Sequence, residues 1–250
     1  MSPRNVRIAH NEDNDDYDYD NAITLVPTQA GQPGNLQPHY QRVLMSKRNI
    51  ANPSPLGLCG FALTTFILSA INMEVMDVTH ANLIVGPAFA YGGLVQLCAG
   101  MWEMSIGNTF GATSLSSYGG FWIGMAIILT PGGFEIEAAY DSEEFNHAFS
   151  LYLFAWFIFT TIILLCTLSS SVAHCSIFFT LDLSLLCLAL GRKYPHLDGL
   201  SYVPHHNLTY AGGVFGLLSA FAAWYNALAG IAASNKAFGH YPPGTALPVV

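Results

Sequence analysis

Six long apolar segments, separated by short polar connections, set the outline of this chain. They cover residues 55–73, 83–101, 114–130, 149–168, 172–190 and 210–233. Each is long enough to cross a bilayer as a helix, which takes about 20 mainly apolar residues. The fourth and fifth segments are joined only by Ser169, Ser170 and Ser171, which predicts a tight helical hairpin. We expect an all-α integral membrane protein whose six transmembrane helices form one bundle over residues 46–240.

The two ends of the chain have a different character. Residues 1–45 are rich in Asp, Asn, Gln and Pro, and six of the 16 acidic residues lie between Glu12 and Asp20. Such a composition cannot bury enough apolar surface to fold, so it predicts a disordered acidic tail. Residues 241–250 are expected to form a short C-terminal tail. The bundle between them carries the function.

Composition supports a membrane protein and excludes several function classes. The chain is 52% hydrophobic and only 10% charged, whereas ordinary soluble domains are about one quarter charged. From residue 50 onward, only Arg192, Lys193 and Lys236 are basic, so no basic patch for nucleic acid is expected. The five cysteines lie in or beside apolar runs without metal-ligand spacing, so we expect no disulfide framework, metal or cofactor.

The distribution of Lys and Arg predicts the orientation in the membrane. An even number of helices places both termini on one side, and that side holds most of the basic residues, from Arg4 to Arg48 together with Lys236. Cytoplasmic loops carry the excess of Lys and Arg in membrane proteins. We therefore expect a multi-pass protein of the cell membrane with both termini in the cytoplasm.

The most distinctive stretch is Asn52-Pro53-Ser54-Pro55-Leu56-Gly57-Leu58. Its two prolines prevent a regular helix through this point, so the first helix must begin here. The free N–H groups that follow form the positive end of a helix dipole, which attracts a carboxylate. The Asn52 side chain can cap this end or donate to an anion. A plain capped helix start is the alternative.

This motif resembles the signature of the acetate uptake transporter family, which includes bacterial succinate–acetate permeases and fungal acetate permeases. The family usually has Ala where this chain has Ser54. Two further stretches agree in order, Phe89-Ala90-Tyr91-Gly92-Gly93 and Gly107-Asn108-Thr109-Phe110-Gly111, the second followed by Ser117-Tyr118-Gly119-Gly120. The acidic tail and the cysteines in the helices resemble the fungal branch.

The resemblance implies a fold, an activity and a set of site residues. Members have six helices per subunit, assemble as hexamers and carry acetate and similar small monocarboxylates, and proton coupling is usually proposed. The resemblance maps the family's apolar pore constriction onto Phe61, Tyr118 and Leu181. The Tyr118 hydroxyl is then expected to hold the carboxylate. Residues 52–58 become candidate substrate-binding residues.

Polar and ionisable residues inside apolar segments are the remaining candidates, because they are costly in lipid. Asp182 lies near the centre of the fifth segment, where it can face the pore as a proton site or bind a neighbouring helix. Glu103 is a second possible proton site, although Glu103, His174, Glu74 and Asp77 are all expected to reach interfacial water. Gln96 can line the pore or bond to another helix.

Other functions stay open on the sequence alone. A channel for water, ammonia or another small neutral solute would use the same architecture, and a non-transporting membrane sensor is a further alternative. Aquaporins need two Asn-Pro-Ala-like half-helices, and this chain has one such motif. We expect no enzyme, because the helices show no His-box, nucleophile motif or clustered carboxylates.

Overall fold

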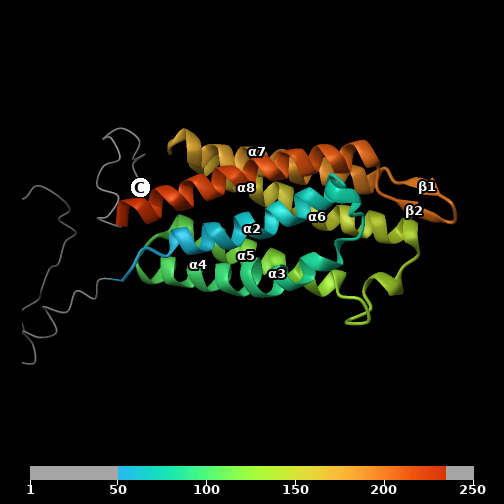
Figure 1. The fold of residues 1–250 in the computed structure, drawn as a ribbon, viewed down its shortest axis with the longest axis horizontal. Helices are drawn as coiled ribbons and strands as arrows, with labels where there is room; N and C mark the ends of the chain where they lie inside the picture. The colour runs from blue at the N-terminus through green and yellow to red at the C-terminus, as the bar shows by residue number, and fades with distance from the viewer. Residues whose placement is uncertain (1–49, 235–250) are drawn as a thin grey trace, which may run out of the picture. The chain divides into compact units, whose positions relative to one another are not determined.

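A computed structural model describes residues 50–234, and the predicted tails at 1–45 and 241–250 lie outside this range. The described part has six helices long and apolar enough to cross a membrane, which confirms the predicted all-α membrane fold. They are α2 (Ser54–Asn72), a composite span over Ala81–Ser105, α5 (Thr109–Leu129), α6 (Ser142–Thr167), α7 (Val172–Lys193) and α8 (His206–Ser234), as Figure 1 shows.

The six spans alternate in direction. Helices α2, α5 and α7 begin at one end of the bundle, which we call the motif end because α2 starts there with Ser54. The other three spans begin at the opposite end. A two-stranded hairpin, β1 (His196–Asp198) and β2 (Ser201–Val203), joins α7 to α8 there, and we call this the hairpin end (Figure 1). Short 3₁₀ turns, η1 (Val75–Asp77) and η4 (Glu137–Ala139), lie in its other loops.

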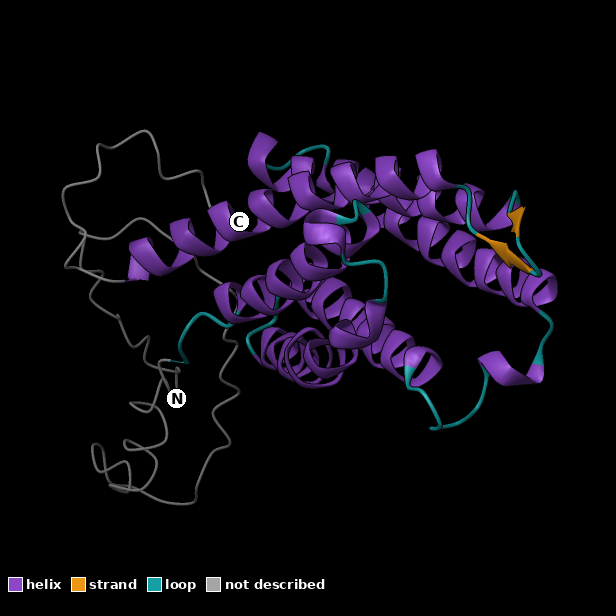
Figure 2. Cartoon of the chain, turned by 45° about the vertical axis from the view of Figure 1, so that its right-hand side comes forward, coloured by secondary structure: helices purple, strands orange, loops and turns teal. Residues whose placement is uncertain are grey.

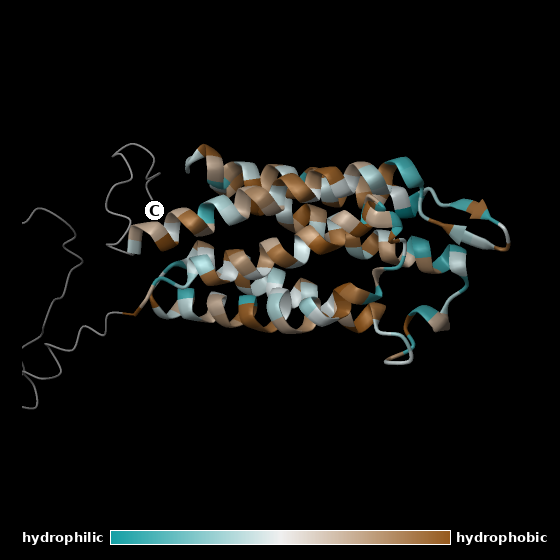
Figure 3. Cartoon of the chain, in the orientation of Figure 1, coloured by the Kyte–Doolittle hydropathy of each residue, from teal (hydrophilic) through white to brown (hydrophobic). Residues whose placement is uncertain are grey.

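Helix α8 packs between α2 and α7, while α6 packs on α7, and the composite span packs on α5 (Figure 1). Figure 2 shows the bundle turned, with the two strands of the hairpin at one end. Small residues allow the close approaches. A Cβ added at Gly212 of α8 would lie 2.7 Å from Leu188 of α7, and one added at Gly213 would lie 2.8 Å from the Ser69 carbonyl oxygen of α2. The outer faces carry exposed apolar side chains such as Leu151, Ile158 and Leu165, which suit contact with lipid. Figure 3 shows hydrophobic residues along all the spans of the bundle.

Three predicted helix starts were wrong. Helix α5 begins at Thr109 and not at 114, because the Asn108 side chain accepts a hydrogen bond from the Gly111 N–H at 3.0 Å. Helix α6 begins at Ser142 and not at 149, because Asp141 accepts from the Glu144 N–H at 2.8 Å. Helix α8 begins at His206 and not at 210. Capping and acidic first turns extend helices beyond their apolar core.

The second span is not one regular helix. It consists of η2 (Ala81–Ile84), α3 (Val85–Phe89), the π-helical turn η3 (Ala90–Val95) and α4 (Gln96–Ser105). The π turn contains Gly92 and Gly93, which allow it to lie close to its neighbours. A Cβ at Gly93 would lie 2.7 Å from Ile123 of α5. Isolated π turns inside α-helices are frequent at functional sites.

Candidate functional site: an amphipathic cavity inside the bundle

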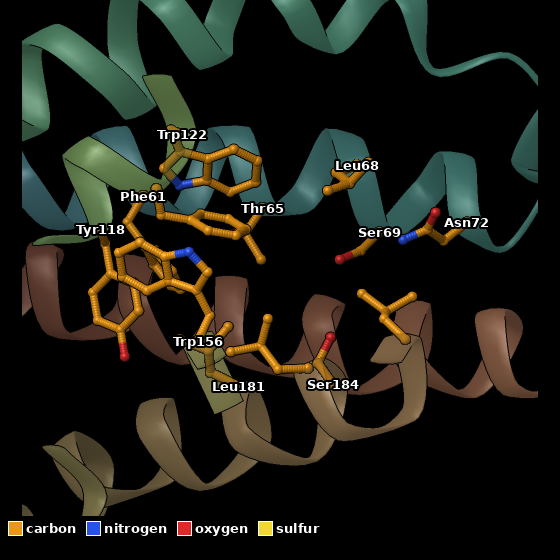
Figure 4. Close-up of a pocket in the computed structure, with 13 residues that line it drawn as sticks. Phe61, Thr65, Leu68, Ser69, Asn72, Tyr118, Trp122, Trp156, Leu181 and Ser184 are labelled. Carbon is orange, nitrogen blue, oxygen red and sulfur yellow. The ribbon is translucent and has the colours of Figure 1, made fainter. Parts of the chain in front are cut away.

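A cavity of about 40 Å³ lies between α2, α5, α6 and α7. This volume holds about three water molecules, since one water needs roughly 10–15 Å³ on this measure. Its lining is shown in part in Figure 4 and consists of Phe61, Thr65, Leu68, Ser69, Asn72, Tyr118, Phe121, Trp122, Trp156, Leu181, Ser184, Leu185 and Leu188. No carboxylate, ammonium or guanidinium group of the described chain lines it.

The three residues predicted for the constriction meet at one end of this cavity. Phe61, Tyr118 and Leu181 are 4%, 4% and 8% exposed, and the Phe61 and Tyr118 ring centroids lie 5.9 Å apart. On α2, α5 and α7 the lining begins at these residues and continues only toward the hairpin end. Their role as the constriction of a conducting pore stays a prediction.

The hydroxyl of Tyr118 already has a hydrogen-bond partner. It lies 2.9 Å from the hydroxyl of Thr160 on α6, and Thr160 is fully buried. The tyrosine ring therefore forms part of the cavity wall while its hydroxyl ties α5 to α6. The expected contact between this hydroxyl and a carboxylate has no support in this geometry.

Asp182 lies next to Leu181 in sequence but not in the cavity lining. Thr161 of α6 donates a hydrogen bond to its carboxylate at 2.9 Å. Of the two predicted arrangements, the structure shows the bond to a neighbouring helix. Two adjacent threonines of α6 thus make hydrogen bonds to residues beside the predicted constriction. Thr160 bonds to Tyr118, and Thr161 bonds to Asp182.

Polar groups lie on the hairpin side of the three bulky residues. Thr65, Ser69 and Asn72 project from one face of α2, since their spacing of four and three residues matches the helical repeat (Figure 4). Ser184 of α7 faces them, and its hydroxyl donates to the Gly212 carbonyl at 2.7 Å. A Cβ at Gly216 of α8 would clash with the Ser69 hydroxyl and lie 3.2 Å from that of Ser184.

The Asn52–Leu58 motif lies at the motif end, outside the cavity lining. The side-chain amide oxygen of Asn52 accepts a hydrogen bond from the Ser54 N–H at 3.0 Å, so this side chain binds the first N–H of α2. The next residues make close helix contacts: a Cβ at Gly57 would lie 2.6 Å from Leu115 of α5 and 3.2 Å from Ala99 of α4. Substrate binding by residues 52–58 stays a prediction, and their observed contacts are those of a packed helix start.

Glu103 lies beside this motif and was wrongly expected to reach interfacial water. Its side chain is fully buried at the end of α4. One carboxylate oxygen accepts from the Ser54 hydroxyl and the other from the Asn108 amide at 2.7 Å. Glu103 therefore links the starts of α2 and α5. Of the other ionisable candidates, His174 packs between Phe110 and Phe178, while Glu74 and Asp77 are exposed as predicted.

Gln96 is fully buried directly after the π turn. Within residues 50–234, neither its amide nitrogen nor its amide oxygen has a hydrogen-bond partner. The Gln96 Cβ lies 3.5 Å from a Cβ added at Gly60, so Gln96 faces α2 from the start of α4 and lies outside the cavity lining. Neither predicted role, pore lining or interhelical hydrogen bond, is observed.

With the geometry described, comparison with known proteins decides the family. Residues 33–249 match the GPR1/FUN34/yaaH family. The chain belongs to this family.

Among individual relatives, acetate permease A of Emericella nidulans is 55% identical over 219 residues, which cover 84% of this chain and 72% of the relative. Ammonia transport outward protein 2 of Saccharomyces cerevisiae is 42% identical over 189 residues, covering 75% of this chain and 64% of the relative. The solved structure of the bacterial acetate channel SatP aligns with a TM-score of 0.63 at 30% identity, covering 78% of this chain and all of that one. None of these proteins is named as an enzyme.

Within this GPR1/FUN34/yaaH member, several cavity residues escaped the sequence analysis. Thr65, Ser69 and Asn72 were overlooked because each alone is unremarkable in an apolar helix. Their common helical face was the available signal. Thr160 and the aromatic wall of Phe121, Trp122 and Trp156 carried no motif, and only tertiary packing brings them to the cavity.

Proposed function

We propose that this chain carries acetate and similarly small monocarboxylates across a cell membrane through the cavity in each subunit. The observation that carries this proposal is the cavity itself: it is small and uncharged, apolar at one end, and lined at the other end by hydroxyl and amide groups set among leucines. Acetate has the same division into a methyl group and a carboxylate. The acetate permease of Emericella nidulans and the acetate channel SatP support the assignment.

Phe61, Tyr118 and Leu181 would act as the selective constriction. A ring of bulky apolar side chains excludes hydrated inorganic ions, because they must shed water to enter. A small solute with one methyl group passes when the ring opens slightly. Selection then depends mainly on size and on the cost of desolvation.

The motif end would be the cytoplasmic approach to the pore, as the distribution of Lys and Arg predicts. There, the Asn52 amide, the start of α2 and the buried Gln96 are proposed as weak contacts that the substrate makes on its way to the cavity, which is the main binding site. Assembly as a hexamer of separately conducting subunits and residence in the plasma membrane belong to the same proposal. Asp182 and Glu103 are the candidate proton sites.

Ammonia export is a second candidate, because the ammonia transport outward protein of yeast is 42% identical to this chain. The same cavity could pass a small neutral molecule. A cavity selective for ammonia has no need of a polar face that accommodates a carboxylate, so the substrate preference distinguishes the two functions.

Reconstitution of the purified full-length protein into liposomes tests the proposal. Uptake of radiolabelled acetate is measured with and without an acid-outside pH gradient, with unlabelled propionate, succinate and ammonium as competitors. We expect saturable acetate uptake that propionate inhibits and ammonium does not. Uptake no faster than in protein-free liposomes, or ammonium flux without acetate flux, would overturn it.

A further inference from the structure

The cavity changes character along α2, and this change suggests how a solute lies in it. Phe61 stands at one end and Asn72 at the other, about 16 Å further along the helix at 1.5 Å per residue. The first part is walled by aromatic rings and Leu181. The second part presents the polar side chains of Thr65, Ser69 and Asn72 together with those of Leu68, Leu185 and Leu188 (Figure 4).

Thr65 has a hydroxyl with unused bonding capacity. Its side chain is 5% exposed, and its oxygen has no hydrogen-bond partner within residues 50–234. Its neighbour Thr64 shows the usual alternative, because that hydroxyl donates to the Gly60 carbonyl of its own helix at 2.9 Å. A buried hydroxyl without a partner is costly. The Thr65 oxygen is nearly inaccessible in this structure, but Thr65 lines the cavity, so a change of its side-chain rotamer would present the hydroxyl to a ligand there.

Ser69 and Asn72 extend this polar face toward the hairpin end. The Ser69 hydroxyl lies over Gly216 of α8, where any side chain would displace it. The Asn72 amide lies one turn further, at the last residue of α2 (Figure 4). Hydroxyl and amide groups both donate to carboxylates, and the hydroxyl hydrogen rotates to suit its acceptor.

We propose that Thr65, Ser69 and Asn72 form a polar subsite along α2 whose donors bind the carboxylate of a small monocarboxylate one after another, with its methyl group pointing toward Phe61 and Leu181. The subsite rests on the proposed transport function and specifies where and in which orientation the substrate binds. All three donors are uncharged, so they hold the carboxylate without the tight binding of an ion pair. Transport requires such a site, since the solute must leave again.

The test compares Thr65→Val with its matched control Thr64→Val. Both changes remove one hydroxyl and keep the side-chain shape, but only Thr65 lines the cavity. In liposomes, Thr65→Val should raise the KM for acetate by roughly tenfold or more, the effect of losing a hydrogen bond to a charged group. Thr64→Val should leave it unchanged, and Thr65→Ser should restore most of the affinity.

Asn72→Leu keeps the test decisive if Thr65→Val does not fold, because Asn72 is only half-buried at the helix end. It should also raise the KM for acetate. The orientation has its own readout: Thr65→Val should weaken acetate and propionate equally, whereas Leu181→Ala should change their ratio.

The outcomes separate this subsite from the function on which it rests. Wild-type protein without saturable acetate uptake would overturn the proposed function. Wild-type uptake with unchanged KM in folded Thr65→Val and Asn72→Leu would overturn the subsite alone. A change in the propionate-to-acetate ratio in Thr65→Val and none in Leu181→Ala would reverse the orientation and contradict the proposal.

Discussion

The two halves of helix α2 differ in their contacts. Its first two turns, from Ser54 to Gly60, are packed against α4, α5 and η3, and Ser54 bonds to the buried Glu103. The later turns, from Phe61 to Asn72, line the cavity and carry the Thr65 hydroxyl, which has no hydrogen-bond partner in the described part of the chain. The distinctive sequence lies where α2 packs against α4, α5 and the π turn, and the polar residues that line the cavity lie further along the helix, where α2 still packs against α8 on another side.

This contrast has a physical basis. Close helix contacts admit few residue types, so Pro55, Gly57 and Gly60 produce a recognisable motif. A cavity wall needs only some donors on the correct face, and common residues such as Thr and Ser provide them. A signature can therefore identify a family without marking the substrate site.

The largest expected effect comes from filling a contact in the packed half. A Cβ at Gly60 would lie 2.8 Å from the Tyr91 carbonyl oxygen in the π turn, and backbone there cannot easily move. Gly60→Ala should destabilise the protein by about 1–3 kcal/mol through overpacking. Thermal unfolding in detergent measures this.

Gly86→Ala is the control for Gly60→Ala, because a Cβ at Gly86 meets nothing within 4 Å. It should be neutral or stabilising by about 0.5–1 kcal/mol, since Ala favours the helix. Equal melting temperatures for the two variants would show that the packed half is looser than described.

The next effect concerns selection of substrates by size at the apolar end of the cavity, where Leu181 of α7 lies near Phe61 of α2. Leu181→Ala should widen the apolar end of the cavity and raise the ratio of lactate to acetate uptake by about tenfold or more, as expected for changes of methylene size in a pocket. Competition between labelled acetate and unlabelled lactate measures it. An unchanged ratio would remove Leu181 from the constriction.

A smaller effect is expected at Asp182, which lies at the same level but faces α6. We expect Asp182→Asn to slow acetate uptake driven by an acid-outside gradient severalfold, because an ionisable group in lipid is usually functional. Uptake is measured at several external pH values, with Glu103→Gln for comparison. If the pH profile of Asp182→Asn matches the wild type, the Thr161 contact is its whole role.

The smallest transport effect is expected at the Tyr118 hydroxyl, which bonds Thr160 at 2.9 Å. Tyr118→Phe should leave the KM for acetate unchanged and reduce stability by about 1 kcal/mol, the usual contribution of one hydrogen bond. Thr160→Val should do the same, and the double variant should lose no more than either alone. A raised KM in Tyr118→Phe would show that the hydroxyl contacts the substrate after all.

Much of the fold was predictable because a helix that crosses lipid must be about 20 residues long and mainly apolar. Six long apolar runs gave the six spans, and the resemblance correctly indicated the family. The helix starts at Thr109 and Ser142 were missed because hydropathy ignores capping side chains. The π turn over Ala90–Val95 and the β1–β2 hairpin depend on local backbone geometry that no periodic pattern reveals.

The candidate site was predicted less completely. Phe61, Tyr118 and Leu181 came from the resemblance, since a single bulky residue in a transmembrane helix carries no signal of its own. The burial of Glu103 could not be read from its place near a helix end, because the Ser54 and Asn108 contacts arise only in the folded bundle. The polar face of α2 could have been predicted, because Thr65, Ser69 and Asn72 are spaced by four and three residues, which matches the helical repeat.

Equilibrium binding of radiolabelled acetate to purified protein tests the contrast between the two halves of α2 most directly. Asn52→Ala tests the motif directly before the packed half, where the Asn52 side-chain oxygen accepts from the Ser54 N–H, and Thr65→Val tests the cavity. We predict that Thr65→Val weakens acetate binding by roughly tenfold or more, and that Asn52→Ala changes it much less. Normal binding in Thr65→Val together with a tenfold loss in Asn52→Ala would place the substrate at the motif and contradict the account.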